Sequence, residues 1–254
     1  MHISNFTEKM QQIAPRELKM DYDNVGLLIG PEKQEIRRVL VALDCTSVTA
    51  KEAIEWGAGL MLTHHPVFFR GTKRIAPDDP ATAGAYMLIR HGIGLFAAHT
   101  NLDAAEDGVN DALAEALGVQ NAVPMEPDGL GRIGTLAVPV SFGTFAKTVE
   151  EKLNTAVRIS GEIDRIISRV AVIGGAAGVY ALWARDAGAE VFVTGECRHH
   201  EALYAREAGI CLIDAGHYET EKTVLNRLIG RLHCEGDDVQ YKVSEYEYGP
   251  LRRL

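Results

Sequence analysis

The sequence has few cysteines and no apolar run long enough to cross a membrane. The four cysteines of the 254-residue chain are scattered without a CxxC pair, so a disulfide framework and a zinc finger are both excluded, and reduced, buried thiols are expected. No segment approaches the roughly 18 consecutive apolar residues of a membrane span. The first residues, Met1 to Asn5, lack the basic-then-apolar pattern of a signal peptide. These absences predict a cytoplasmic protein with no membrane association.

Positive charge is also scarce. The chain has 26 lysines and arginines against 35 aspartates and glutamates, which gives a net charge of −9. This balance argues against non-specific binding to nucleic acid or to an anionic membrane. Charged residues make up 24% of the chain and apolar residues 46%, a composition typical of a globular protein and not of a disordered one.

Short, almost uninterrupted apolar runs alternate with helical stretches in the first half of the chain. The runs are Arg38–Leu43, Leu60–Leu62 and Gly94–Ala98, and a helical stretch at Ser47–Gly57 separates the first two. Continuous apolar strands, as opposed to alternating ones, are typical of a sheet buried on both faces. The fold class that we predict is therefore α/β.

The second half of the chain repeats this pattern. Arg169–Gly174 resembles Arg38–Leu43, and at the same spacing Val193-Thr194 matches Leu62-Thr63. A longer loop around Phe69–Ala83 accounts for the change of spacing further along the first half. Although two α/β segments can resemble each other by chance, a spacing kept through strand, helix and strand favours an internal duplication. We therefore expect two similar three-layer α/β domains.

The domain boundary is predicted in a segment rich in proline and glycine, Val123–Arg132. This places the first domain at residues 1–126 and the second at residues 127–254. Val239–Tyr248 alternates apolar and polar residues, as an edge strand would.

Histidines are concentrated at the predicted strand ends. In an open α/β sheet, ligands bind outside the carboxyl ends of the strands. Imidazoles and carboxylates together are typical ligands of Zn, Mn, Fe or Co. Six of the nine histidines lie at such ends: His64, His65, His99, His199, His200 and His217.

The spacing of these residues predicts which of them bind metal. His217 and Glu221 are four apart, so one helical turn directs both at the same point. His64 and His65 cannot share a face of a strand, but in a turn they can diverge toward two metals about 3.5–4 Å apart. His99 has a second interpretation, as a residue that orients a neighbour, and Asp103 has one as a helix N-cap. We interpret His64, His65, Asp103, His217 and Glu221 together as metal ligands.

A glycine-rich segment, Gly174–Gly178, follows a predicted strand and opens a helix. It lacks the Lys-Ser/Thr of a phosphate-binding P-loop. Two interpretations stay open at this point: close packing, which we favour, and anion binding at the helix N-terminus.

Five motifs along the chain resemble the GTP cyclohydrolase I type 2 homolog family of dinuclear-metal proteins. The resemblance covers nearly the whole chain, and the motifs occur in the family's order. Arg198 departs from the family's usual lysine before the paired histidines, with the charge kept. The motifs are Asp23-Asn24-Val25-Gly26-Leu27, Thr63-His64-His65-Pro66, His99-Thr100-Asn101-Leu102-Asp103, Thr194-Gly195-Glu196 and Gly216-His217-Tyr218-Glu219-Thr220-Glu221.

The resemblance implies two α/β domains with a two-metal site between them, in chains assembled as a toroidal homohexamer. It further implies that His65 and Asp103 bind one divalent ion, that His64 and His217 bind the other, and that Glu221 touches both.

Paired metals bridged by a carboxylate usually serve hydrolysis. We therefore expect a metal-dependent hydrolase that acts on a nucleotide-like or other small polar substrate, with GTP cyclohydrolase activity as the form that the resemblance implies. His99 and Glu196 are the expected proton shuttles, because both lie at strand ends beside the ligands. The alternative is a non-catalytic metal-binding hexamer with a scaffold or regulatory role.

Overall fold

The chain forms two compact units. The computed structural model describes residues 1–125, 129–233 and 238–251. Unit 1 contains residues 1–106 and 225–248, and unit 2 contains residues 107–224 with the chain from residue 249. Among the expected reduced cysteines, Cys45, Cys197 and Cys211 are free thiols, of which Cys211 is buried and the other two are half-buried, and Cys234 lies outside the described residues.

Unit 1 is a five-stranded sheet with helices on both faces. Its elements are α1 (Ile3–Ile13), the 3-10 turn η1 (Arg16–Leu18), β1 (Gly26–Ile29), β2 (Arg38–Ala42), α2 (Ser47–Trp56), β3 (Leu60–Thr63), α3 (Ala83–His91), β4 (Gly94–Ala97), α4 (Thr100–Ala104), α10 (Val224–Leu232) and β11 (Gln240–Val243).

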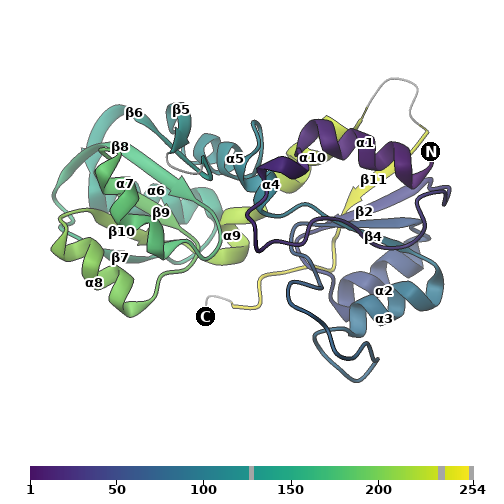
Figure 1. The fold of residues 1–254 in the computed structure, drawn as a ribbon. Helices are drawn as coiled ribbons and strands as arrows, with labels where there is room; N and C mark the ends of the chain where they lie inside the picture. Colours follow the sequence, from purple (N-terminus) through teal and green to yellow (C-terminus); the bar gives the residue numbers. More distant parts are fainter. Residues whose placement is uncertain (126–128, 234–237, 252–254) are drawn as a thin grey trace. The chain divides into compact units, whose positions relative to one another are not determined.

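The strand order in unit 1 is β1-β4-β3-β2-β11. β2 lies parallel to both β3 and β11, β3 lies parallel to β4, and β1 pairs antiparallel with β4. All four residues of β3 and of β4 are buried, as expected where both faces are covered. Helices α2 and α3 lie on one face and α1 and α10 on the other (Figure 1). On the α1 face, Phe6 packs edge-on against Phe96 with the ring centroids 5.6 Å apart.

Unit 2 repeats this architecture around a six-stranded sheet. Its elements are α5 (Val109–Ala116), β5 (Gln120–Met125), β6 (Gly131–Ser141), α6 (Phe142–Leu153), β7 (Arg158–Ser160), β8 (Ile166–Ile173), the 3-10 turn η2 (Gly178–Tyr180), α7 (Ala181–Asp186), β9 (Val191–Thr194), α8 (His199–Glu207), β10 (Cys211–Asp214) and α9 (His217–Glu221).

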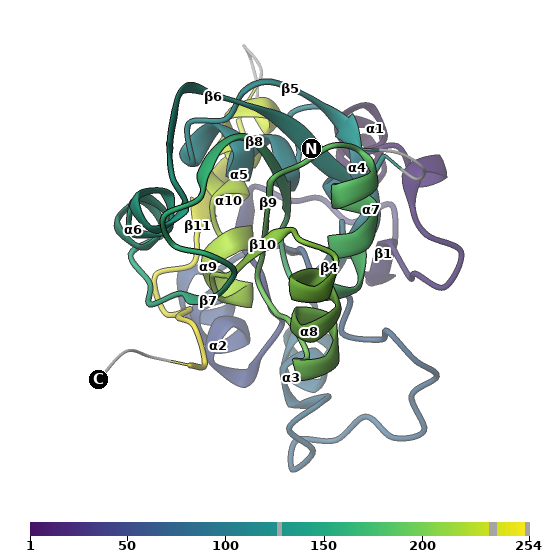
Figure 2. The ribbon, with the colours of Figure 1, turned by 90° about the vertical axis from the view of Figure 1, so that its left-hand side faces the viewer.

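The strand order in unit 2 is β5-β6-β8-β9-β10-β7. β8, β9 and β10 are parallel, and the flanking strands β6 and β7 are antiparallel to their neighbours. Val170 and Val172 of β8 point to the face where Phe142 and Phe145 of α6 complete the core. Helices α7 and α8 lie on the opposite face (Figure 2).

The two units confirm the predicted fold class and the internal duplication. β2-α2-β3-α3-β4 in unit 1 corresponds to β8-α7-β9-α8-β10 in unit 2, and in each unit an antiparallel strand, β1 or β7, pairs with the third parallel strand. The equivalent strand ends, those of β3 and β9 and those of β4 and β10, carry the residues that the sequence singled out.

The compact units differ from the division predicted at residue 126. Helix α5 and strand β5 belong to unit 2, because β5 pairs antiparallel with β6. Toward the C-terminus the chain returns to unit 1, because β11 pairs in parallel with β2. β11 lies at the edge of its sheet, which confirms the edge strand predicted within Val239–Tyr248.

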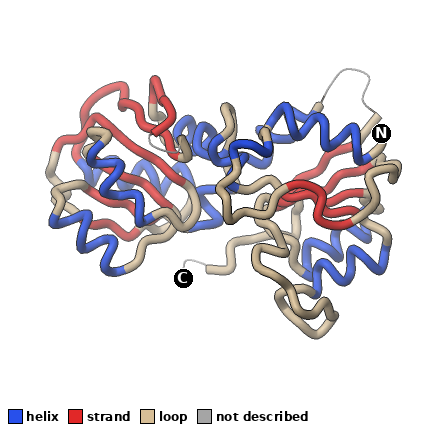
Figure 3. The backbone as a smooth tube through the Cα atoms, viewed as in Figure 1, coloured by secondary structure: helices blue, strands red, loops and turns tan. Residues whose placement is uncertain are grey.

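A long loop, residues 64–82, connects β3 to α3 in unit 1 (Figure 3). It is the extra segment that the change of spacing between the halves predicts. Within the described residues, no helix combines the length and the apolar character that crossing a bilayer requires.

Candidate metal centre

The paired histidines of unit 1 directly follow β3. The backbone N–H of His64 donates to the carbonyl of Ala42 (3.2 Å), and that of His65 donates to the carbonyl of Leu43 (2.9 Å). The parallel pairing of β3 with β2 therefore continues past the end of β3 and fixes the backbone of both histidines. The His64 side chain is 1% exposed and that of His65 is 24% exposed, with ring centroids 5.0 Å apart.

The end of β4 supplies two further residues. His99 precedes α4, and Asp103 lies within this helix. The His99 ring lies 5.1 Å from the ring of His64 and 5.6 Å from that of His65. A nitrogen from each of the three imidazoles lies within 4.8 Å of the other two. Asp103 Oδ1 is 3.5 Å from His64 Nε2. These four residues, His64, His65, His99 and Asp103, are called the unit 1 set below.

Each imidazole of the unit 1 set uses its Nδ1 in a hydrogen bond. A carbonyl or an ionised carboxylate can only accept, so each Nδ1 carries the proton and each Nε2 presents its lone pair. This is the tautomer that binds metal through Nε2, with the opposite N–H held by an acceptor. The acceptors are Ala98 O for His64 (2.8 Å), Asp44 Oδ1 for His65 (2.9 Å) and Asp23 Oδ1 for His99 (2.9 Å).

Asp23 is itself firmly held. It is 7% exposed and accepts hydrogen bonds from the backbone N–H groups of Asn24 (2.8 Å) and Thr100 (3.0 Å). Burial alone would raise the pKa of Asp23, but the hydrogen bonds from His99 and Thr100 outweigh burial and lower it. An ionised Asp23 therefore fixes the orientation of His99.

Asp44 is positioned by the C-terminal segment of unit 1. The carboxylate of Glu247 accepts the backbone N–H groups of Leu43 (2.8 Å) and Asp44 (2.7 Å). Burial raises the pKa of Glu247 to about 6, although these two hydrogen bonds oppose the rise. Glu247 thus holds the backbone from which Asp44 reaches His65.

Unit 2 contributes a smaller set of residues on α9. His217 and Glu221 are one helical turn apart, with His217 Nε2 3.2 Å from Glu221 Oε1. His217 Nδ1 donates to Glu196 Oε1 at 2.8 Å, so this imidazole also presents Nε2. Glu221 is buried and Glu196 is exposed. His217 and Glu221 are called the unit 2 set below.

The glycine-rich segment after β8 packs directly against the unit 2 set. Gly175 has a φ of +68°, and a Cβ at this position would collide with Glu221 Oε1 and lie 3.4 Å from His217 Nε2. Its N–H donates to Thr220 Oγ1 (3.1 Å), and that of Gly174 donates to Asn110 Oδ1 (2.8 Å). With these donors used inside the protein, the structure favours the close-packing interpretation over anion binding.

The donor chemistry of both sets fits divalent metals. Neutral imidazole nitrogens with carboxylate oxygens, and without thiolates, suit Zn, Mn, Fe or Co. The residues that can hold an ion are His64, His65, His99, His217 and Glu221, and Asp103 lies beside the first of them. By contrast, His199 and His200 are exposed on α8 and are not among these residues.

Two acceptors, Asp23 and Asp44, were not predicted to take part in the site. Both have a signal in the sequence: Asp44 directly follows the apolar run Arg38–Leu43, and Asp23 begins the first of the five motifs. Glu196, expected to be a proton shuttle, accepts a hydrogen bond from His217, so its observed contact is one that positions the imidazole.

Comparisons with known proteins cover the full length of both units. A family model described as Duf34/NIF3 (NGG1p interacting factor 3) matches residues 1–250. The GTP cyclohydrolase 1 type 2 homolog of Clostridium perfringens is 32% identical over 259 residues, covering 99% of each chain. The NIF3 homolog of Schizosaccharomyces pombe is 30% identical over 281 residues, covering 100% of each.

The fold is shared with solved structures. The crystal structure of a Staphylococcus aureus protein has a TM-score of 0.92 and 30% identity, covering 100% of this chain and 99% of that one. A Bacillus cereus protein related to NIF3 has a TM-score of 0.93 at 24% identity, covering 100% and 99% of the two chains. The similarity therefore extends through both units.

Proposed function

The chain belongs to the Duf34/NIF3 family, and we propose that it is a dinuclear-metal protein in which the residues of the unit 1 set and of the unit 2 set bind two divalent ions. The number of donors supports this proposal. The unit 1 set offers three imidazoles and a carboxylate, and the unit 2 set adds an imidazole and a carboxylate. One tetrahedral site needs only four donors.

The ligand assignment follows the family pattern carried onto this sequence. His65 and Asp103 bind one ion, His64 and His217 bind the other, and Glu221 contacts both. The burial of Glu221 supports this role, because a carboxylate shielded from water is favoured where cations compensate its charge.

The observation that carries the proposal is the common hydrogen-bond arrangement of the imidazoles. His64, His65 and His217 all donate Nδ1–H to an acceptor at 2.8–2.9 Å. An arrangement that leaves Nε2 as the available nitrogen on every one of them matches what metal binding requires. His2 and His91, outside both sets, also form hydrogen bonds through Nδ1. The histidines of the unit 1 set differ from them because nitrogens of His64, His65 and His99 lie within 4.8 Å of one another.

The proposed reaction is hydrolysis of a nucleotide-like or other small polar substrate. Two adjacent divalent ions supply an activated water and a binding point for a substrate oxygen. His99 is the proposed group for proton transfer, since Asp23 holds it with Nε2 available to accept a proton. Glu196 is the second proposed proton shuttle, and its hydrogen bond to His217 gives it a positioning role as well.

The proposal also includes the assembly and the compartment. We assign the chain to a cytoplasmic toroidal homohexamer, on its resemblance to the family. The free thiols are compatible with a reducing compartment, and burial with the neighbouring Asp44 raises the pKa of Cys45 to about 12, which leaves this thiol unreactive.

A substrate screen on protein of known metal content tests the reaction. Metal-loaded wild type and the His65→Ala variant are each assayed for hydrolysis of nucleoside triphosphates, GTP among them, and of other small esters and amides. The proposal predicts turnover by wild type that the variant loses. Bound metal without turnover of any compound would reject the hydrolase and favour a metal-binding scaffold or regulatory protein.

A further inference from the structure

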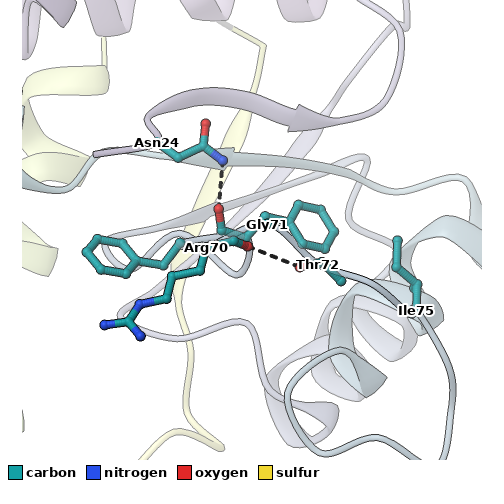
Figure 4. Close-up of a pocket in the computed structure, with 7 residues that line it drawn as sticks. Asn24, Arg70, Gly71, Thr72 and Ile75 are labelled. Carbon is teal, nitrogen blue, oxygen red and sulfur yellow. Dashed lines mark hydrogen bonds between the residues drawn. The ribbon is translucent and has the colours of Figure 1, made fainter. Parts of the chain in front are cut away.

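The long loop after β3 forms a pocket in unit 1 that the metal proposal does not use. Its volume is about 450 Å³, and its walls come from this loop and from Asn24 in the segment before β1. In the close-up, Arg70 extends on one side of the pocket and Ile75 lies on the opposite side (Figure 4).

The apolar part of the pocket is aromatic and accessible. Phe68, Phe69 and Ile75 contribute to the lining, and Phe69 and Ile75 keep 41% and 43% of their surface exposed. Large apolar side chains grouped around a hollow in this way are typical of ligand sites. A flat ring that packs against these residues removes apolar surface from water, which favours binding.

Phe69 connects the pocket to the unit 1 set. Its ring packs edge-on against the His99 imidazole, with centroids 5.8 Å apart. Tyr22 packs against Phe69 in the same manner at 6.0 Å. A molecule in the pocket would therefore be one side chain away from the imidazole proposed to transfer protons.

The charged part of the pocket is a single guanidinium. Across residues 1–125, 129–233 and 238–251, no carboxylate forms an ion pair with Arg70. Arg74, four residues further along the same loop, is paired with Asp78 at 2.7 Å. In a chain with a net charge of −9, an arginine left available beside an aromatic wall is suited to an anionic ligand.

The pocket is held in shape by the protein itself. Asn24 Nδ2 donates to the carbonyl of Phe68 at 2.9 Å, and Thr72 Oγ1 donates to the carbonyl of Arg70 at 3.4 Å (Figure 4). The first bond ties the loop to a segment distant in sequence. A partly preformed site loses less entropy when it binds a ligand.

From these observations we infer that the pocket binds the planar ring of an anionic substrate, of the class of purine or pyrimidine mononucleotides. The ring packs on Phe69 and Ile75, and Arg70 binds the phosphate. This inference rests on the proposed function, for which it names the substrate class. It places the ring one side chain, Phe69, away from His99 of the unit 1 set.

Calorimetric titration of the metal-loaded full chain tests the inference with three ligands. Guanosine 5′-monophosphate carries ring and phosphate, guanosine carries the ring alone, and ribose 5-phosphate carries the phosphate alone. Wild type should bind the nucleotide more tightly than either part. Phe69→Ala should weaken both guanosine and the nucleotide about tenfold, the usual effect of losing an aromatic stacking partner.

Arg70→Ala should have a different effect. It should remove most of the preference for the nucleotide over guanosine and leave guanosine binding unchanged. The matched control is Arg74→Ala, which removes the same charge from the same loop but leaves the pocket intact. Ile89→Ala, on the exposed surface of α3, controls for Phe69→Ala, and Ile75→Ala provides a second test of the apolar wall.

The metal content of every preparation separates this inference from the proposed function. Preparations that bind no metal contradict the proposed function, whatever they do with nucleotides. If metal is bound but ribose 5-phosphate binds as tightly as the nucleotide, the phosphate goes to the metals and the pocket inference is wrong. Equal binding by Arg70→Ala and Arg74→Ala, or no effect of both Phe69→Ala and Ile75→Ala, would also overturn it.

Discussion

Gly175→Ala offers a way to disturb the proposed metal site without removing a ligand. Gly175 has a φ of +68°, where a residue with a Cβ is strained by about 1–2 kcal/mol. Its added Cβ would also collide with Glu221 Oε1 and approach His217 Nε2 to 3.4 Å. Glu221 is buried, so its carboxylate has no open space into which it can move freely.

Gly209→Ala is the matched control, because it isolates the backbone strain. Gly209 has a φ of +75° in the same unit, and a Cβ there would meet nothing within 4 Å. Both variants should lose about 1–2 kcal/mol of unfolding free energy without metal, and Gly175→Ala should lose more because the buried carboxylate is displaced. Only Gly175→Ala should weaken metal binding, by about 10–100-fold, the range seen when a ligand's support is disturbed.

The assay is a competitive metal titration with a chromophoric chelator, combined with urea unfolding of the metal-free proteins. Gly175→Ala should keep the circular dichroism of wild type and show a reduced gain in melting temperature on adding metal. If both variants bind metal as tightly as wild type, Glu221 is not a ligand. If both lose metal equally, strain in unit 2 is responsible and not the contact with Glu221.

Three further predictions concern other parts of the molecule. Glu221→Ala should lose most of both metals, whereas His64→Ala should keep about one per chain; equal losses by elemental analysis would refute the bridging role. Glu52→Gln should destabilise unit 1 by about 2–4 kcal/mol in urea titrations, because glutamine has no charge and replaces one acceptor oxygen with an NH2 donor. In the buried Glu52, Oε1 accepts from Lys242 Nζ (3.1 Å) and the Glu245 N–H (3.0 Å), and Oε2 accepts from the Tyr246 N–H (3.2 Å). Burial would raise the pKa of Glu52, but its hydrogen bonds outweigh burial and lower the pKa below 4.5. The greater unfolding free energy of wild type over Glu52→Gln should therefore be complete above pH 4.5 and should disappear as the pH falls further. A difference in unfolding free energy that persists at low pH would refute this. Light scattering should give a hexamer of the 27.7 kDa chain, and a monomer at micromolar concentration would reject that assignment.

The fold could be predicted from the sequence because its determinants are local. The apolar runs that became β2, β3 and β4 are continuous, and such runs occur where helices cover both faces of a sheet. The repeat of this pattern at β8, β9 and β10 predicted the duplication. The return of β11 to unit 1 could not be predicted, because its pairing with β2 joins residues far apart in the chain and nothing in a four-residue strand identifies its partner.

The candidate site could be predicted only in part, for a related reason. His64, His65 and His217 were found because histidines at strand ends are unusual in composition. Their acceptors were missed, since Asp23 and Asp44 become recognisable only when folding brings each carboxylate within 2.9 Å of an imidazole. The contact between Gly175 and Glu221 was equally hidden, because sequence alone does not report the space around a glycine.

The most direct test of the account is the number of metals that each chain binds. The protein is stripped with a chelator, reconstituted separately with zinc, manganese, iron and cobalt, freed of loosely held ions by gel filtration, and analysed by elemental mass spectrometry against protein concentration. If both sets bind metal as proposed, two ions should stay tightly bound to each chain for at least one of these metals. At most one tight ion per chain with every metal would contradict it.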